Sequence, residues 1–519
     1  MENESRNKHM LLGFLGNLAN SSVTSILGFI SRTVFIYYLG KTYLGLSGLL
    51  TNIFGILSIT ELGIANAITF SLYKPLANKE YKMVSILMTV YRKAYLIIGC
   101  LVFILGLILL PFLDFFIAPN QQPADIIPIY LVYLLSTAIG YFFYYKTTLI
   151  TADQKGYKLV PIQMKYSILM VIMQIVVIII FKSYIVYLVV QVSFNLLSAY
   201  MQNKYVSKEY TEVDFYEKEK LPKEERKEIV KNIKGLLVLK LGDFCVNSTD
   251  NLIITKFVNL ATVGVYSNYI MLRDLVNTYI RMIFNNAGAS FGNVLVTESK
   301  GKQRELFENL NFLAFWIYSF EAVCFFGLFN LFIELWIGKD YLFSAPVVFL
   351  IVINNFLTGL RVPIITIKNS AGLYYEDRMV PIVFAVVNLV ASVILAQKFG
   401  ISGVILGTII GSFCFADWYR PYLVYKKIFN VSVLSYYIKN IIYIIMTILE
   451  MLLIYIITKV LLNQIPLLLQ FIIVGCICLI LPNLLNVALF HRRHEFQYLK
   501  RLVINIVNMI KNKVTQNKK

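Results

Sequence analysis

Between Ile233 and Val296, six of the charged residues fall inside apolar runs, and side chains of these types can bind ions or anionic ligands. They are Lys240, Asp243, Asp250, Arg273, Asp274 and Arg281. An ionisable group inside a membrane costs a few kcal/mol, so it is retained where it is paired or faces water. The flanking sequences LLVL, LIIT and YIML predict a bilayer here, and the stretch is long enough for two membrane-spanning helices.

The spacing of these charges places them on particular helix faces. Asp243 and Asp250 are seven residues apart and share one face, and Lys240 lies one turn before Asp243. Arg273 and Arg281 are eight residues apart and lie broadly on one side of the next helix. We expect the two helices to line a hydrated, charged cavity within the membrane. The alternative is that these charges form structural ion pairs between neighbouring helices.

The composition predicts an all-α polytopic membrane protein. Hydrophobic residues make up 58% of the 519 residues, and charged residues only 15%. Almost wholly apolar runs such as Leu96–Leu110 and Ile168–Phe181 exclude a β-barrel, whose strands alternate in polarity. A net charge of +19 is also typical of proteins that bind nucleic acid. Because the basic residues gather in the connections between apolar runs, they indicate membrane topology instead.

Histidine and cysteine give no sign of catalysis or of a metal site. His9, His491 and His494 lie at the chain ends, and all six cysteines lie in apolar spans, where they pack as small hydrophobic residues. There is no Walker sequence for nucleotide binding. We therefore predict no enzyme activity, no metal and no cofactor. Energy for any transport would come from a Na+ or H+ gradient, the membrane potential or the substrate gradient.

The apolar runs predict fourteen membrane spans. Their residue ranges are 10–38, 43–73, 94–113, 126–150, 159–181, 183–203, 236–257, 263–296, 306–337, 344–367, 379–397, 402–425, 440–459 and 466–490. Several exceed the roughly 20 residues that cross a bilayer, so they must tilt or extend beyond it. With the N-terminus inside, 36 of the 48 lysines and arginines fall in inner connections and termini, and six in outer ones. The positive-inside rule then predicts that both termini are cytoplasmic.

A charged break at 203–234 separates six predicted helices from eight. We interpret it as a cytoplasmic linker, in which Pro222 begins a short surface helix or the chain is a plain solvated tether. The predicted domains are an N-terminal lobe at 1–204, the linker at 205–235, a C-terminal lobe at 236–427, a helix pair at 428–490 and a basic amphipathic tail at 491–519. A faint repeat, YLGLS at 43–47 and TVGVY at 262–266, supports duplication of a six-helix unit.

Three further charged residues within predicted spans of the two lobes are candidate site residues. Arg32 lies in the first span, Glu61 in the second, and Arg361 in the tenth, just before Pro363. Guanidinium groups are always charged and bind phosphate oxygens with two hydrogen bonds, so an anionic ligand such as a phosphate is expected. The alternative is that the arginines pair with Glu61 and the acids named above and bind nothing.

Two stretches resemble a known family. YYLGKTYLGLSGLLTNIFGILSITELGIANAITFSLYKPLANKE at 37–80 is similar to the N-terminal signature of bacterial polysaccharide repeat-unit flippases of the Wzx type. TDNLIITKFVNLATVGVYSNY at 249–269 resembles the family's pattern at the start of the second lobe. These proteins belong to the multidrug/oligosaccharidyl-lipid/polysaccharide exporter (MOP) superfamily.

The resemblance implies two six-helix lobes in a V around a central cavity. It also implies a monomer in the bacterial plasma membrane that moves an undecaprenyl-pyrophosphate-linked oligosaccharide to the outer leaflet for capsule or exopolysaccharide synthesis. Expected partners are membrane lipids, a polysaccharide polymerase and glycosyltransferases, and no nucleic acid. Arg32, Arg273 and Arg281 match positions where relatives hold pyrophosphate. The resemblance also implies a cation on the second helix, where this chain has Glu61 instead. The alternatives are a flippase for a peptidoglycan or teichoic acid precursor, or a cation-coupled drug exporter of the same superfamily.

Overall fold

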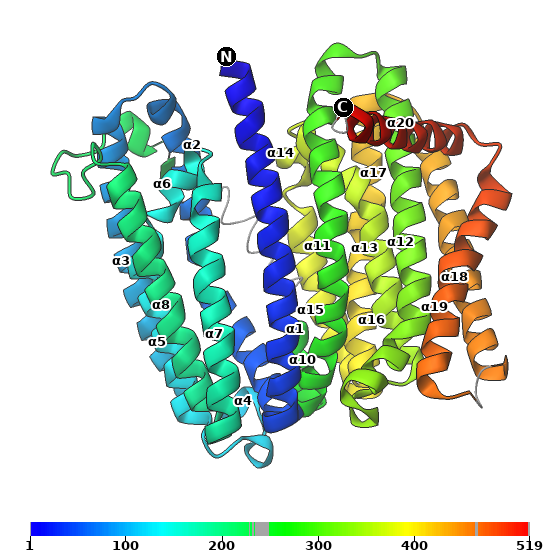
Figure 1. Cartoon of the computed structure of the whole chain (residues 1–519), viewed down its shortest axis with the longest axis horizontal. Coiled ribbons are helices and arrows are strands. Elements are labelled where there is room, and N and C mark those ends of the chain that lie inside the picture. Colours follow the sequence, from blue (N-terminus) through cyan, green and yellow to red (C-terminus); the bar gives the residue numbers. More distant parts are fainter. Residues whose placement is uncertain (1, 228, 231–232, 234–248, 462–464, 517–519) are drawn as a thin grey trace. The chain divides into compact units, whose positions relative to one another are not determined.

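The computed structural model describes residues 2–227, 229–230, 233, 249–461 and 465–516, and every regular element among them is helical (Figure 1). The chain divides into two compact units, Met1–Ser267 and Asn268–Lys519. Eleven helical segments of the described residues are long and apolar enough to cross a membrane. The protein is therefore an all-helical, multi-pass membrane protein.

The first unit consists of a long kinked helix followed by antiparallel neighbours. Its helices are α1 (Glu2–Leu57), α2 (Ile59–Ala77), α3 (Tyr81–Leu109), α4 (Leu113–Phe116), α5 (Ile126–Tyr144), α6 (Thr147–Ala152), α7 (Val160–Phe181), α8 (Tyr184–Glu209) and α10 (Asp250–Phe257). α3, α5, α8 and α7 lie side by side in that order, and α1 packs on α7 (Figure 1). α11 (Leu260–Thr297) begins in this unit and continues into the second.

The second unit is organised around α12. Its helices are the rest of α11, α12 (Lys300–Ile337), α13 (Ala345–Ser370), α14 (Tyr374–Asp377), α15 (Val380–Phe399), α16 (Ile401–Gly411), α17 (Asp417–Val424), α18 (Leu434–Leu461), α19 (Leu467–Phe490) and α20 (His494–Gln516). α12 packs against α13, α18 and α19, and α15 packs against α16. Two π-helical turns, Ser412–Ala416 and Tyr425–Phe429, flank α17.

The eleven candidate spans differ from the fourteen predicted ones for identifiable reasons. α1 runs through Gly40, a non-helical kink with φ 74°, and a second break at Ser58 separates it from α2. The predicted second span therefore becomes the end of α1 and a separate α2. α11 is a single helix of 38 residues and is not among the eleven candidate segments. Most of the predicted seventh span, 236–257, lies outside the described residues. The helix with Arg361 continues past Pro363 to Ser370.

Connections predicted to lie on one side of the membrane contact one another at one end of the first unit. Lys158 pairs with Glu209, and the Tyr210 hydroxyl donates to Asp153 at 2.6 Å. At the other end, the Lys256 ammonium lies over the Phe115 ring. The linker is also partly folded: Val213 and Phe215 are buried in the core of this unit, and a helix begins after Pro222. The structure thus favours the predicted surface helix over a plain tether.

The two glycines of the faint repeat lie against each other where α1 crosses the start of α11. A Cβ added to Gly45 would lie 1.9 Å from the Leu260 carbonyl oxygen, and a Cβ added to Gly264 would lie 2.0 Å from that of Lys41. The contact is reciprocal, and each glycine allows the backbone of the other helix to approach. The repeat noted in the sequence therefore marks a close backbone contact.

The C-terminal helix α20 crosses the end of α12 and does not run alongside it (Figure 1). The Trp316 and Phe496 rings stack with their centroids 5.6 Å apart. The Lys439 ammonium donates to Glu495 at 2.8 Å and to Glu308 at 3.0 Å. Burial alone would raise the pKa of the Glu495 carboxyl, but Lys439 and the other favourable contacts of this carboxylate lower it below its usual value.

Candidate functional site

Arg281 lies near the middle of α11 and is exposed. Within the described part of the chain its guanidinium makes no hydrogen bond or ion pair, although Tyr318 and Glu321 lie within electrostatic reach. A free guanidinium at this depth is tolerated in water and not in lipid. Arg281 is therefore available to bind an anion, and its place in a central cavity stays a prediction.

Arg273, two turns earlier on α11, pairs with its neighbour Asp274. Its Nε and Nη2 atoms donate to one carboxylate oxygen at 3.0 and 2.8 Å. The two side chains are 23% and 49% exposed. Because ion pairs that are open to water contribute little free energy, this pair can be exchanged for a ligand anion. Arg273 thus realises one of the ion pairs that the alternative interpretation expected, in an arrangement that still permits binding.

A polar cluster on the neighbouring helices was not recognised as a site in the sequence. Glu321 on α12 is only 4% exposed, and Asn277 on α11 and Asn355 on α13 are buried beside it. The Asn277 amide donates to the Asn355 carbonyl oxygen at 2.9 Å. Glu321 stands out in its apolar run, but the sequence offers no partner for it. Its neighbours are uncharged amides from two other helices, which no spacing rule brings together.

Arg32 on α1 lies in a second polar cluster, within the first unit. Its guanidinium donates to the Ser267 hydroxyl at the start of α11 and lies near Tyr184 and Tyr187 on α8. The adjacent Ser31 hydroxyl shares a hydrogen bond of 2.9 Å with Tyr187. The half-buried Arg32 therefore has hydroxyl groups among its neighbours.

A polar stripe runs along α8 at helical spacing. Its members are Tyr184, Tyr187, Gln191, Asn195, Ser198 and Gln202. Most of them bond to neighbouring helices, as Gln191 does by accepting from Gln174 and Gln202 by accepting from Gln163. Asn195 differs, because its side chain has no hydrogen-bond partner among the described residues. Polar side chains commonly join helices in membranes, so an unpartnered one in the stripe indicates a place for water or a ligand.

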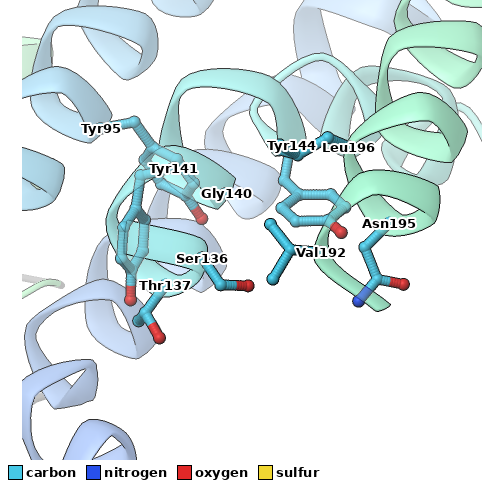
Figure 2. A pocket seen from close by; sticks show the side chains of 9 residues that line it. All are labelled: Tyr95, Ser136, Thr137, Gly140, Tyr141, Tyr144, Val192, Asn195 and Leu196. Atoms are coloured by element: carbon cyan, nitrogen blue, oxygen red, sulfur yellow. The ribbon is translucent and has the colours of Figure 1, made fainter. Parts of the chain in front are cut away.

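Asn195 lines a cavity of about 210 Å³ between α3, α5 and α8. Figure 2 shows Ser136 and Tyr144 of α5 around the same space as Asn195 and Val192 of α8. The Ser136 hydroxyl, like the Asn195 amide, has no hydrogen-bond partner in the described part of the chain. The cavity therefore combines free hydroxyl and amide groups with tyrosine rings. Such a lining suits a ligand with many hydroxyl groups and an apolar ring face.

Arg361, the fourth predicted anion ligand, is held by other side chains. Its guanidinium lies 2.6 Å from Asp417 and donates to the Ser412 hydroxyl at 2.6 Å. The two charged side chains are 16% and 21% exposed. Asp417 follows directly after a π-helical turn, which was not foreseen in the sequence. The ion-pair alternative therefore describes Arg361 better than substrate binding does.

The remaining predicted site residues are on separate elements. Glu61 lies in the first turn of α2 and not in the middle of a continuous helix, because the break at Ser58 starts a new helix before it. Asp250 is the first residue of α10, where the helix dipole favours an acid. Lys240 and Asp243 lie outside the described residues, so their placement stays a prediction. In the described ranges, no three His, Cys, Asp or Glu side chains gather as metal ligands.

Solved structures with a similar fold are transporters and not enzymes. A lipid II flippase, MurJ, in an inward closed conformation matches with a TM-score of 0.63 and 13% identity, over 92% of this chain and all of that one. An inward-facing multidrug resistance MATE family transporter of the MOP superfamily gives 0.57 and 16%, over 75% and 91%. The MATE transporter VcmN of Vibrio cholerae gives 0.58 and 15%, over 82% and 98%.

The chain thus has the fold of MOP superfamily transporters, at a sequence identity that establishes the fold alone. No protein-family model matches the sequence, and no curated protein matches it either. The all-helical, multi-pass membrane character and the MOP-like fold implied by the resemblance are confirmed, whereas the two six-helix lobes in a V and the added helix pair stay predictions. The polysaccharide-flippase subfamily and its substrate belong to the proposal below.

Proposed function

We propose that this protein is a flippase that moves undecaprenyl-pyrophosphate-linked oligosaccharide repeat units from the inner to the outer leaflet of a bacterial plasma membrane. The observation that carries the proposal is the exposed Arg281 in the middle of α11, with no partner in the described part of the chain. A pyrophosphate is a natural ligand for such a group, because guanidinium donors match phosphate oxygens. Arg273, two turns earlier on the same helix, is a further pyrophosphate contact in this proposal.

The cavity beside Asn195 supports a glycan as the other part of the substrate. Saccharides present hydroxyl groups to the free Ser136 and Asn195 side chains and C–H faces to the ring of Tyr144. A purely apolar drug would leave these polar groups unsatisfied, which costs free energy in a protein interior. This cavity therefore favours a lipid-linked sugar over an apolar drug.

Two other functions remain as alternatives within the same superfamily. The first is a flippase for a peptidoglycan or teichoic acid precursor, which shares the polyprenyl and phosphate chemistry; the match to MurJ over 92% of this chain favours it as the second candidate. The other is a cation-coupled drug exporter. An exporter of cationic drugs needs an acidic binding surface, whereas α11 presents Arg281 free and Arg273 accessible.

Export of the glycan tests the role of Arg281. In cells that lack the chromosomal gene, we expect Arg281→Ala to reduce surface glycan at least tenfold at equal protein level in the membrane. Arg281→Lys keeps the charge but loses the forked donors, so we expect it to retain part of the export. The amount of surface glycan per folded protein is the measurement.

The control for this experiment is Arg378→Ala, because Arg378 is also exposed in the second unit and its guanidinium lies over the Tyr375 ring. We expect this variant to export normally. Normal export by Arg281→Ala would remove the pyrophosphate assignment. Accumulation of a peptidoglycan precursor in place of the capsular intermediate, when the gene is deleted, would transfer the function to the first alternative.

A further inference from the structure

Glu321 is a buried acid whose carboxylate is unsatisfied. The side chain is 4% exposed, and both carboxylate oxygens lack a hydrogen-bond partner among the described residues. It lies in the middle of α12, a helix long and apolar enough to cross a membrane. An ionised carboxylate in such surroundings is costly unless it is paired, and adding a proton removes the charge.

The Asn355 side chain is a hydrogen-bond donor next to Glu321. The Asn355 carboxamide faces the carboxyl group without closing a hydrogen bond to it, and its Nδ2 atom has no other partner in the described part of the chain. The Asn355 carbonyl oxygen is occupied by the Asn277 amide. A small movement of α13 relative to α12 would thus give Glu321 one donor. The site is assembled from three helices and is incomplete in this conformation.

The charged groups near Glu321 are those of the proposed anion site. Arg273, Asp274 and Arg281 of α11 act on its carboxyl group electrostatically. On α12 itself, the titratable neighbours are Tyr318 and Cys324. The two arginines outnumber the one acid on α11, so the local potential favours a negative charge on Glu321, in opposition to burial. Burial and the two arginines therefore act in opposite directions, and a change in either one changes the protonation of Glu321.

We propose that Glu321 is a proton site linked to anion binding at Arg273 and Arg281. When a pyrophosphate neutralises the arginines, the carboxylate loses their support and takes up one proton from water; when the anion leaves, the proton returns to water. The inference rests on the proposed function, because it needs an anion at these arginines. It adds Glu321 on α12 as a specific coupling group for the proposed transport.

A proton fits this site better than a metal cation. A sodium ion needs several oxygen ligands, and here the Asn355 oxygen already accepts a hydrogen bond, so the Glu321 carboxylate is the principal oxygen donor left. The adjacent arginines also repel a cation, whereas they do not obstruct a proton bound covalently to the carboxyl oxygen. Linkage of one proton changes ligand affinity by about tenfold per pH unit over the range where the group titrates.

The experiment uses the full chain in lipid nanodiscs and a polyprenyl-pyrophosphate-linked sugar as the probe. The phosphates of such a diester stay ionised through the neutral range, so any pH dependence of binding comes from the protein. We expect the affinity of the wild type to fall by about tenfold per pH unit as pH rises through the titration of Glu321. Proton uptake on binding, measured in weak buffer, should approach one per bound probe.

Glu321→Gln is the decisive variant, because glutamine imitates the protonated acid. We expect it to bind the probe at high pH as tightly as the wild type does at low pH, with no proton uptake. Glu450→Gln is the matched control: Glu450 on α18 is equally buried but accepts from Ser319 at 3.0 Å, so this variant should keep the pH dependence. Retention of the wild-type pH dependence by Glu321→Gln would overturn the proposal.

Infrared spectroscopy separates failure of this inference from failure of the proposed function. A carboxylic-acid C=O band that disappears in Glu321→Gln but not in Glu450→Gln would support the proton site even if the probe does not bind, in which case the pyrophosphate function is wrong. Absence of that band at every pH, together with normal binding, would instead remove Glu321 as a proton site.

Discussion

Individual arginines in this protein have different surroundings, although the sequence presents them alike. Arg281 is exposed, Arg273 pairs with a partly exposed acid, and Arg361 is enclosed by Asp417 and Ser412. All four predicted arginines interrupt apolar runs, which is why the sequence could identify them. It could not rank them, because Ser412 and Asp417, the partners of Arg361, lie in a π-helical turn and directly after it, more than fifty residues along the chain.

The enclosure of Arg361 predicts a loss of stability and not of binding. Arg361→Met leaves the Asp417 carboxylate without its cation, and we expect unfolding to become easier by roughly 2 kcal/mol, because the pair is mostly buried. Export per folded protein should be unchanged. The double variant Arg361→Met with Asp417→Asn should recover part of the loss. Thermal unfolding in detergent measures both effects, and an export defect in a fully stable Arg361→Met protein would restore Arg361 to the binding site.

Among the helices, α11 connects most of the features described above. It begins at the glycine contact with α1, presents Ser267 to Arg32, and carries Arg273, Asn277 and Arg281 further along. Its charges made it the centre of the sequence prediction, and it is not among the eleven apolar segments. The helix itself could be predicted from sequence. The buried amide cluster that it forms with α12 and α13 could not be predicted, because a hydropathy pattern does not single out uncharged amide side chains.

The crossing of α1 and α11 predicts a sharp difference between two glycines on one helix. Gly45→Ala would place a Cβ 1.9 Å from the Leu260 carbonyl oxygen, so the helices must separate, at a cost on the order of 3 kcal/mol. Gly264→Ala should cost a similar amount. Gly28→Ala is the control, because nothing lies within 4 Å of its added Cβ, and alanine there should be neutral or stabilising by up to about 1 kcal/mol.

Thermal unfolding and the yield of folded protein in membranes compare these variants. The close crossing is refuted if Gly45→Ala and Gly264→Ala are as stable as Gly28→Ala. The faint repeat in the sequence identified both glycines. It gave no indication that they touch each other, because a repeat shows equivalence between segments and not their distance.

At the scale of the whole molecule, the distribution of lysine and arginine predicts a topology with both termini in the cytoplasm. The contacts among the basic connections at one end of the first unit agree with the alternation, but the side of the membrane is still a prediction. In a cysteine-free background, single cysteines should react with an impermeant reagent from outside at positions 41, 256 and 339. Those at 79, 220 and 302 should react only in opened cells. Reaction at 220 in intact cells would reverse the orientation.

The positions of the helices could largely be predicted from the sequence, but their breaks could not. Apolar runs located nearly all the helices, because hydropathy is a local property. They did not reveal the break at Ser58 or the π-helical turns, which depend on tertiary packing. Nor could hydropathy divide the chain into the compact units that meet within α11, because that division depends on contacts between distant segments. The two-lobe organisation with a linker at 205–235 therefore stays a prediction.

The central claim is that this protein flips a polyprenyl-pyrophosphate-linked glycan, and reconstitution tests it most directly. Purified protein in vesicles should move a fluorescent glycan of this kind between leaflets, and Arg281→Ala should slow the movement at least tenfold while Arg378→Ala does not. Outward movement of the charged pyrophosphate should be faster with a potential that is negative inside, by the sign of the charge. Equal rates in protein-containing and empty vesicles, or full activity of Arg281→Ala, would contradict the account.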